Sequence, residues 1–330
     1  MWLSTAPISL IRYLIAWRVH APLVRLPPCL PAAISTVLGT LVAERLPTQQ
    51  ARPWRKALAG PPGQAAGVRL AASNWPIEGM IFFPPGKRTY GMDEIIPWEL
   101  KLLGPHADHG LFLELILPAI EAAAVTRDPR WFANYSLWGR FAVQSIFVAK
   151  GARWEPLAED GRLNLNLRPS AAQWAEGLWS AGQPERTIHH IRWVTPFAFD
   201  PAPTAPVERS QAPGGGRTIA VEEVPSLERM VEACLRRLAT IAMERRAPVR
   251  DPWSLLEPAE RDSLQAALAT PAALRKHTFV QPPKGWPGNW IGEQVFAAPI
   301  PIPLLPYLNL AAILHIGDFT HYGCGTFRLK

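Results

Sequence analysis

The stretch GDFTHYGCGTFRLK (317–330) is the most informative segment of the sequence. It combines three glycines, three aromatic residues, a histidine and two cations, and it follows an apolar, helix-like run over residues 304–316. Glycine lets a backbone approach a ligand closely and leaves its N–H groups accessible, which suits a partner that carries phosphate groups. The segment therefore predicts a glycine-rich loop that faces phosphate and closes in a short strand.

Together with the preceding residues LNLAAILHIG (308–317), this ending resembles the glycine-rich loop of the CRISPR repeat-processing endoribonucleases, members of the repeat-associated RNA-binding protein superfamily. The family form is a helix, then His-x-Gly, then Thr or Ser with Gly-x-Gly and a basic strand. His315-Ile-Gly317, Thr320 and Gly323-Cys-Gly325 fit this form, whereas Thr326-Phe327 replaces the last glycine pair of many members. Taken alone, the glycines also fit a plain loop that closes the edge of a sheet.

Other segments resemble the same family in the same order along the chain. The segment IHHIRWVTPFAF (188–199) resembles the strand ending in Thr-Pro that opens the second ferredoxin-like half. Upstream, IIPWELKLLG (95–104) resembles the family's strand ending in glycine, and residues 111–125 resemble the helix that follows this strand. Residues 13–45 resemble the first strand and helix of the same fold. The resemblance implies an α+β fold with two tandem ferredoxin-like (RRM-like) halves.

The expected domains are an N-terminal half over residues 1–168 and a C-terminal half over 186–330, with a helical insertion over 222–278. Ser226 is expected to cap a helix that runs to about Arg246. Three later pairs each place a cap residue before a proline at the first helical position, and so predict three short helices before strands resume near residue 290: Asp251-Pro252, Glu257-Pro258 and Thr270-Pro271.

Residues 10–20 alternate between apolar and largely polar positions. Because side chains alternate across a strand, this pattern predicts a half-buried strand with a basic outer face. One face holds Ile11, Tyr13, Ile15, Trp17 and Val19, and the other Arg12, Leu14, Ala16, Arg18 and His20. Residues 47–67 and 200–217 are rich in loop-forming residue types, and both are expected to be loops, the first one mobile and basic.

Composition narrows the classes of function that the protein can have. A chain of 330 residues with 48% hydrophobic residues can bury a substantial core in two domains. A formal charge of +7 and a pI near 9.6 favour a polyanionic partner without identifying one. The most apolar N-terminal stretch, 8–24, is interrupted by Arg12, Arg18 and His20, so we expect a cytoplasmic protein without a membrane partner.

The cysteines and carboxylates exclude two further classes of site. Cys29, Cys234 and Cys324 are odd in number and far apart, which argues against a disulfide framework or a zinc ribbon. No carboxylate cluster has metal-ligand spacing, and we expect neither a metal nor another cofactor.

The family resemblance implies cleavage of a CRISPR repeat RNA hairpin at its base, with the mature guide kept in an effector complex beside other subunits. In that chemistry the 2′-hydroxyl attacks its own phosphate, without a metal. Many members use a histidine in or after the first helix, but residues 31–46 contain none. His20 is the closest substitute, although a strand histidine on a polar face is more often a plain surface residue.

Arginine offers the alternative catalytic set, which we favour narrowly. Arg25 and Arg45 flank the first helix and are expected to stabilise the scissile phosphate, as in family members from type IV systems that use arginines around a helical insertion. The missing histidine also leaves open a different class of function, a catalytically inactive RNA-binding subunit of a CRISPR ribonucleoprotein.

Two segments are expected to contact RNA. The helix from Ser226 carries arginines at spacings that share a stripe, although Glu228, Glu232 and Glu244 also fit a solvated face. In the glycine loop, Tyr322 is expected to stack on an unpaired base. The full predicted RNA-binding set is Arg229, Arg236, Arg237, Arg245, Arg246, His321, Tyr322, Gly323, Gly325 and Arg328.

Overall fold

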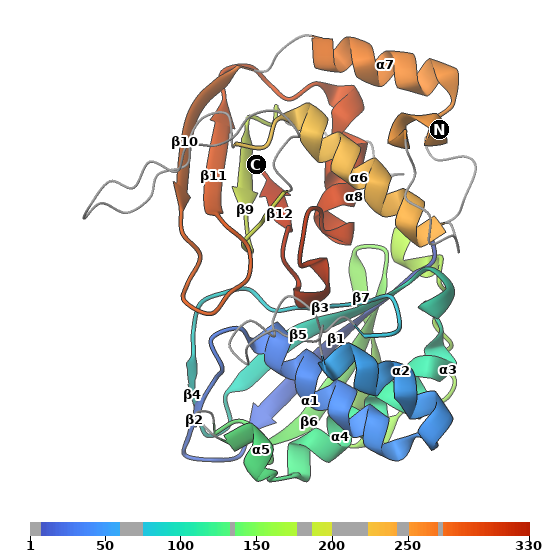
Figure 1. Ribbon diagram of the computed structural model, residues 1–330, viewed down its shortest axis with the longest axis vertical. Helices are drawn as coiled ribbons and strands as arrows, with labels where there is room; N and C mark the ends of the chain where they lie inside the picture. Colours follow the sequence, from blue (N-terminus) through green and yellow to red (C-terminus); the bar gives the residue numbers. More distant parts are fainter. Residues whose placement is uncertain are drawn as a thin grey trace. The chain divides into compact units, whose positions relative to one another are not determined.

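The computed structural model describes residues 8–59, 75–132, 136–176, 187–199, 224–242, 251–269 and 273–330. These residues belong to two compact units, one within 8–176 and the other within 187–330, and each is described by itself (Figure 1). Across the described ranges, no helix combines the length and the apolar character that crossing a membrane requires.

The N-terminal unit is built on a six-stranded antiparallel sheet in the order β3-β5-β1-β6-β7-β8. The strands are β1 Leu10–Val19, β3 Gly79–Phe82, β5 Ile95–Leu103, β6 Phe141–Lys150, β7 Arg153–Glu159 and β8 Arg162–Leu163. The helices that connect them are α1 Leu30–Arg45 and a continuous run of α3 His109–Leu111, a π-helix Phe112–Ile116 and α4 Leu117–Val125. The chain order β1-α1-β3-β5-α4-β6 with this strand order is a ferredoxin-like arrangement, extended by β7 and β8.

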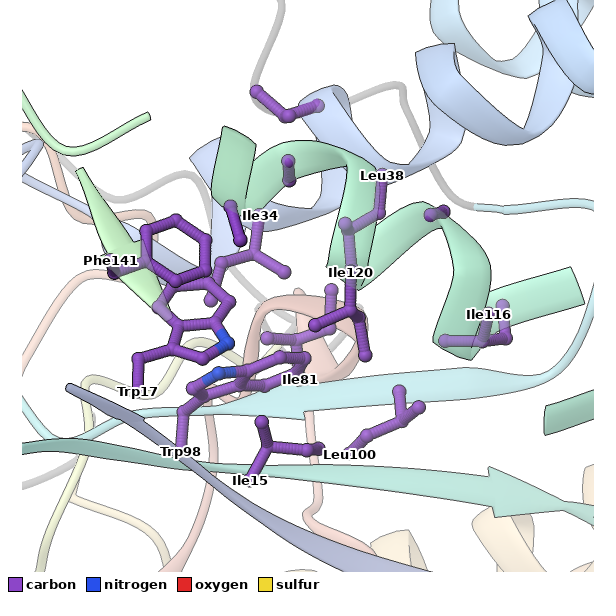
Figure 2. Close-up of a cluster of buried hydrophobic side chains, with 14 of the residues drawn as sticks. Ile15, Trp17, Ile34, Leu38, Ile81, Trp98, Leu100, Ile116, Ile120 and Phe141 are labelled. Atoms are coloured by element: carbon purple, nitrogen blue, oxygen red, sulfur yellow. The ribbon is translucent and has the colours of Figure 1, made fainter. Parts of the chain in front are cut away.

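The core of this unit lies between one face of the sheet and the helices, where side chains from both layers interdigitate (Figure 2). Trp17 packs against Phe141 and Trp98, with ring centroids 4.1 and 5.1 Å apart. The predicted alternation of β1 is confirmed, because its apolar face is buried whereas Arg18 and His20 are exposed.

The predicted loop over residues 47–67 is wrong over Thr48–Ala59, which form helix α2, and its remainder, 60–67, lies outside the described residues. Ala51 and Trp54 are buried, and the helix packs against α1. The Trp54 ring also lies 5.6 Å from that of Trp75. Two anchors three residues apart share one helix face, so burial of that face outweighs the polar composition and Pro53.

The C-terminal unit repeats the arrangement on a four-stranded antiparallel sheet in the order β10-β11-β9-β12. Its elements are β9 His190–Trp193, α6 Leu227–Ala242, α7 Pro258–Ala269, β10 Leu274–Val280, β11 Ile291–Phe296, α8 Leu305–Leu314 and β12 Phe327–Leu329. The order β9-α6-β10-β11-α8-β12 is again ferredoxin-like, with α7 added between α6 and β10. The expected α+β fold is confirmed.

The helix from Ser226 is capped as expected, since the Ser226 hydroxyl accepts a hydrogen bond from the Arg229 N–H (3.1 Å). However, α6 fills the place of the first ferredoxin-like helix and is not an insertion. The Asp251-Pro252 and Glu257-Pro258 signals are confirmed by a 3-10 helix, Pro252–Leu255, and by α7.

The prediction of a third helix after Thr270-Pro271 is wrong, because strand β10 begins at Leu274. Phe279 is buried while its neighbours Thr278 and Val280 are exposed, and this alternation pairs with β11. Cross-strand pairing with β11 thus overrides a local helix-start signal. The predicted loop 200–217 lies outside the described residues.

Candidate nucleic-acid interface

The glycine-rich segment after α8 is a tight backbone turn in which three glycines adopt positive φ: Gly317, Gly323 and Gly325. A Cβ on Gly325 would lie 1.9 Å from the Ile316 carbonyl oxygen, and one on Gly317 would lie 2.2 Å from that of Ala198. No side chain fits at these distances. The glycines are therefore required for close contact between segments of the chain itself.

Hydrogen bonds join this loop to the Thr-Pro segment that follows β9. The Asp318 N–H donates to the Ala198 carbonyl (2.9 Å), and the Gly325 N–H donates to the Pro196 carbonyl (2.9 Å). The Thr326 N–H donates to the Thr195 hydroxyl (3.2 Å). The two motifs that carry the family resemblance in the C-terminal half are therefore side by side.

Two expectations for the loop need correction. The Gly323 and Gly325 N–H groups are not available to a phosphate, because they donate to the carbonyls of Thr320 and Pro196 (both 2.9 Å). The Tyr322 side chain is 1% exposed and His321 is 5% exposed, so the Tyr322 ring is not positioned to stack on a base. Arg328, by contrast, is exposed on β12.

The arginines of α6 have different surroundings and do not form one exposed stripe. The Arg229 guanidinium lies 5.2 Å from the ring centroid of Phe199. Arg236 is exposed and pairs with Glu232 one turn earlier (2.6 Å), as expected for a solvated face. Arg237 is half-buried, and Arg245 and Arg246 lie outside the described residues.

Arg25 and Arg45 lie at opposite ends of α1, so they cannot contact the same phosphate. Arg25 ends β2 (Leu23–Arg25), which precedes the helix, whereas Arg45 is the last residue of α1. Sixteen helical residues span about 24 Å. The Arg45 guanidinium donates to the Pro118 carbonyl of α4 (3.1 Å), which gives it a structural role. The predicted Arg25–Arg45 pair is therefore wrong as a joint catalytic site.

His20 and Arg25 both contact the segment before β6. The His20 N–H donates to the Arg140 carbonyl (3.1 Å), and the Arg25 N–H donates to the Ser136 hydroxyl (3.0 Å). The side chains of His20 and Arg25 are exposed. The backbone at the histidine candidate and at one of the two arginine candidates is thus anchored to the same segment, residues 136–140.

Sequence reasoning missed two cations beside them. Strand β2 pairs with β4 (Thr89–Gly91), which places Arg25 opposite Thr89 and next to Lys87 and Arg88. The Arg88 guanidinium donates to the Leu26 carbonyl (3.2 Å), and Lys87 forms an exposed ion pair with Glu94 (2.5 Å). A glycine followed by two cations, GKR (86–88), is the sequence signal that marks this basic turn. We call His20, Arg25, Lys87 and Arg88 the basic end of the N-terminal unit.

A shallow depression of about 660 Å³ lies on the sheet face opposite the core of this unit. It is lined by Ala16, Arg18, Asp93, Ile95, Gln144 and Ser145, with Arg18 two residues before His20. Guanidinium, amide and hydroxyl groups together can hydrogen-bond a polar ligand.

The same sheet face carries a charge cluster in which Glu99 and Lys101 are buried and Arg12 is half-buried. Glu99 accepts from the Arg12 guanidinium (2.6 Å), and the Lys101 ammonium is 4.0 Å away. Burial lowers the pKa of Lys101 to about 8, and Arg12 acts in the same direction while Glu99 opposes it. Burial also acts to raise the pKa of Glu99, but the charges of Lys101 and Arg12 and the Arg12 hydrogen bond outweigh it and hold that pKa below its usual value.

Comparison with known proteins finds solved structures with a similar architecture. No family model and no curated protein matches the sequence. Among solved structures, a partial Cas6-RT-Cas1–Cas2 complex is 11% identical with a TM-score of 0.54, over 99% of this chain and 47% of that one. A second Cas6-RT-Cas1–Cas2 complex gives the same identity, TM-score and coverage of this chain, over 29% of its own.

A third similar structure, a Cas6 product complex, is 18% identical with a TM-score of 0.47, over 98% of this chain and 100% of that chain. In the two complexes with higher TM-scores, this chain spans less than half of the matching chain. At these identities the likeness concerns the fold. The chain therefore has the Cas6-type α+β fold, built here from two ferredoxin-like units.

Proposed function

We propose that the protein is a metal-independent endoribonuclease that cleaves precursor CRISPR RNA at the repeat hairpin and retains the mature guide in an effector complex. The observation that carries the proposal is the joining of two motifs within a Cas6-type fold. The glycine loop, His315 to Gly325, is hydrogen-bonded to the Thr195-Pro196 strand end. The formal charge of +7 is consistent with an RNA partner. We also propose the cytoplasm as its location and other CRISPR subunits as its partners.

We place the catalytic step at the basic end of the N-terminal unit. The 2′-hydroxyl of the RNA attacks the adjacent phosphorus, and the bond from phosphorus to the 5′-oxygen of the next nucleotide breaks. The products are a 2′,3′-cyclic phosphate and a 5′-hydroxyl. Arg25 stabilises the extra negative charge of the transition state, and His20 takes the proton from the attacking hydroxyl or returns one to the leaving oxygen. An arginine-centred site would match the type IV variant of the family.

A second function remains as the alternative, that of an RNA-binding subunit without cleavage activity. The observation that favours it is the absence of histidine from residues 31–46, which include most of α1.

The test is incubation of the full chain with a panel of 5′-labelled CRISPR-repeat hairpin RNAs in the presence of EDTA. We expect cleavage at the base of one hairpin and a product ending in a 2′,3′-cyclic phosphate. Tight binding without cleavage across the panel would favour the subunit function, and cleavage that EDTA abolishes would contradict the metal-independent mechanism.

A further inference from the structure

The open face of the C-terminal sheet is formed by residues that point away from α6 and α8. On β9, Ile191 and Trp193 are buried at 0% and 2% exposure, so His190 and Arg192 lie on the opposite face. The backbone pairing extends this face across all four strands.

Two neighbouring rows of side chains cross this face. In the first, the residues lie in register in the order Arg328, Arg192, Glu293 and Thr278. In the second row the order is Lys330, His190, Val295 and Lys276. The rows are about 6.7 Å apart, the rise of two strand residues. Together they hold four permanently cationic side chains and one carboxylate, and we call them the Arg192 face.

The pair Arg192 and Arg328 is the unusual feature of the Arg192 face. The two residues are directly opposite on adjacent strands, and both are exposed. Like charges at such positions destabilise a sheet. The nearby Glu293 pairs with His190 (3.1 Å), and among the described residues no carboxylate lies within ion-pair distance of either arginine. A bound anion would relieve this repulsion.

A third row, next to Glu293 and Thr278 of the first row, is apolar on β11 and β10, and it indicates which kind of anion fits. It holds Ile291 and Val280, which are paired on β11 and β10, and Val280 is 60% exposed. A strand with unpaired bases presents phosphates to cations and riboses or bases to apolar side chains, whereas a duplex hides its bases. The sheet is about 14 Å wide across four strands, which suits a single strand crossing it.

We propose that the Arg192 face binds the backbone of a single-stranded RNA segment, with Arg192 and Arg328 each contacting phosphate. This inference rests on the proposed function for the identity of the polymer, and it adds a binding surface on the C-terminal unit to the basic end of the N-terminal unit, where cleavage is placed.

The experiment uses the full chain and a fluorescently labelled oligouridylate of about twelve nucleotides, with anisotropy measured from about 50 to 300 mM potassium chloride. For the double variant Arg192→Gln, Arg328→Gln we expect affinity at least about tenfold weaker at 0.1 M salt. The slope of log affinity against log salt should become shallower by about 1.4, or about 0.7 for each lost phosphate contact. The charge-conserving variant Arg192→Lys, Arg328→Lys should keep the wild-type slope.

The matched control is Arg153→Gln, Arg162→Gln, which removes the same charge from exposed residues of β7 and β8 in the other unit. Its slope should stay at the wild-type value. Removing the repulsion should leave the glutamine variant of the Arg192 face at least as heat-stable as the wild type. Equal slopes in the wild type and that variant, or an equal loss in the control, would overturn the inference. An equal loss of affinity for a duplex RNA would also overturn it.

Hairpin cleavage separates this inference from the proposed function. If the wild type cleaves a hairpin and the glutamine variant keeps the wild-type salt slope, the inference fails and the proposed function stands. If the wild type cleaves no hairpin but the variant loses oligouridylate affinity, the Arg192 face stands and the cleavage function fails.

Discussion

At some positions the surrounding backbone atoms dictate which residue type can be present, and Gly325 shows this most clearly. Its φ of +81° is strained for any residue with a side chain, and its Cβ position is occupied by a carbonyl oxygen. Gly161 has a similar φ of +75° but has nothing within 4 Å of its Cβ position. The two positions therefore separate conformational strain from steric exclusion.

We expect Gly325→Ala to lower the free energy of unfolding by about 3 kcal/mol or more, because the new methyl group must displace the Ile316 carbonyl. The matched control Gly161→Ala should cost only the strain of positive φ, about 1–2 kcal/mol. Urea unfolding followed by circular dichroism measures both. Equal losses would show that the close approach at Gly325 is relaxed in solution.

Glu99 is the second residue whose role depends on its neighbours, because its negative charge compensates the buried Lys101 and the half-buried Arg12. Replacing it with Gln leaves Arg12 and Lys101 without their carboxylate, and we expect a loss of about 3–5 kcal/mol at neutral pH. The control Glu155→Gln breaks an exposed pair with Lys150 and should change stability by less than about 1 kcal/mol.

The pH dependence of Glu99→Gln has a definite sign. Lys101 has a folded-state pKa of about 8 against an ordinary value of 10.5, so the folded state releases this proton first and stability rises with pH between the two values. Without Glu99 the pKa of Lys101 falls further, so the free energy of unfolding of the variant begins to rise at a lower pH than that of the wild type. The deficit of the variant, measured by urea unfolding, should therefore shrink as pH rises above 7. A deficit independent of pH would argue against a charged Lys101.

At the scale of elements, helix α1 separates two arginines that look equivalent in the sequence. Its N-terminal end follows β2, whose Arg25 belongs to the basic end. Its C-terminal end is hydrogen-bonded to α4 through Arg45. The presence of arginines near the helix therefore does not by itself define a site. The length of the helix determines which of them can act together.

We expect Arg25→Ala to slow single-turnover cleavage of the repeat hairpin by about a hundredfold, with affinity only modestly reduced, because it removes a contact to developing charge. Arg45→Ala is the matched control and should leave the cleavage rate nearly unchanged. An equal loss in both variants would contradict the assignment of catalysis to the basic end.

The role of His20 is tested by the pH profile of cleavage. A general acid or base of this residue type bends the rate near neutral pH, whereas arginines stay protonated over the accessible range. If Arg25 acts with His20, the wild type should show a bend that His20→Ala removes. A wild-type rate that rises steadily with pH would leave His20 without a catalytic role.

At the scale of the whole molecule, each of the two ferredoxin-like units carries a basic surface of its own. The basic end belongs to the N-terminal unit and the Arg192 face to the C-terminal one. Binding and cleavage should therefore be separable by changes in the RNA as well as in the protein.

A single 2′-deoxy substitution at the cut site is expected to abolish cleavage while the affinity for the hairpin stays within about twofold, because it removes only the attacking oxygen. Gel analysis of the labelled hairpin and a binding titration measure the two effects. A hairpin cut at that site in its 2′-deoxy form would contradict attack by the RNA's own hydroxyl.

The sequence predicted much of the fold, and the reason is local. The alternation of residues 10–20 and the Ser226 cap depend on neighbouring residues, so they can be predicted without tertiary contacts, whereas the arrangement in two halves was implied by the family resemblance of the segments. The prediction failed where packing outweighed local signals. Helix α2 forms because Trp54 is buried, and β10 forms because β11 pairs with it.

The half-buried strand over residues 10–20 could be predicted from the sequence because side-chain alternation is a property of the residues themselves, and the family resemblance implied the α+β fold with two ferredoxin-like halves. The reason why Gly317 and Gly325 must be glycine lies in their contacts with distant carbonyls, and the tertiary structure also determines which residues share a site. It joined His20 and Arg25 through the segment Ser136 to Arg140 and separated Arg25 from Arg45 by the length of α1. It also set Arg192 opposite Arg328. Proximity between distant residues arises from strand register and helix length in the folded chain, and sequence spacing does not encode it directly.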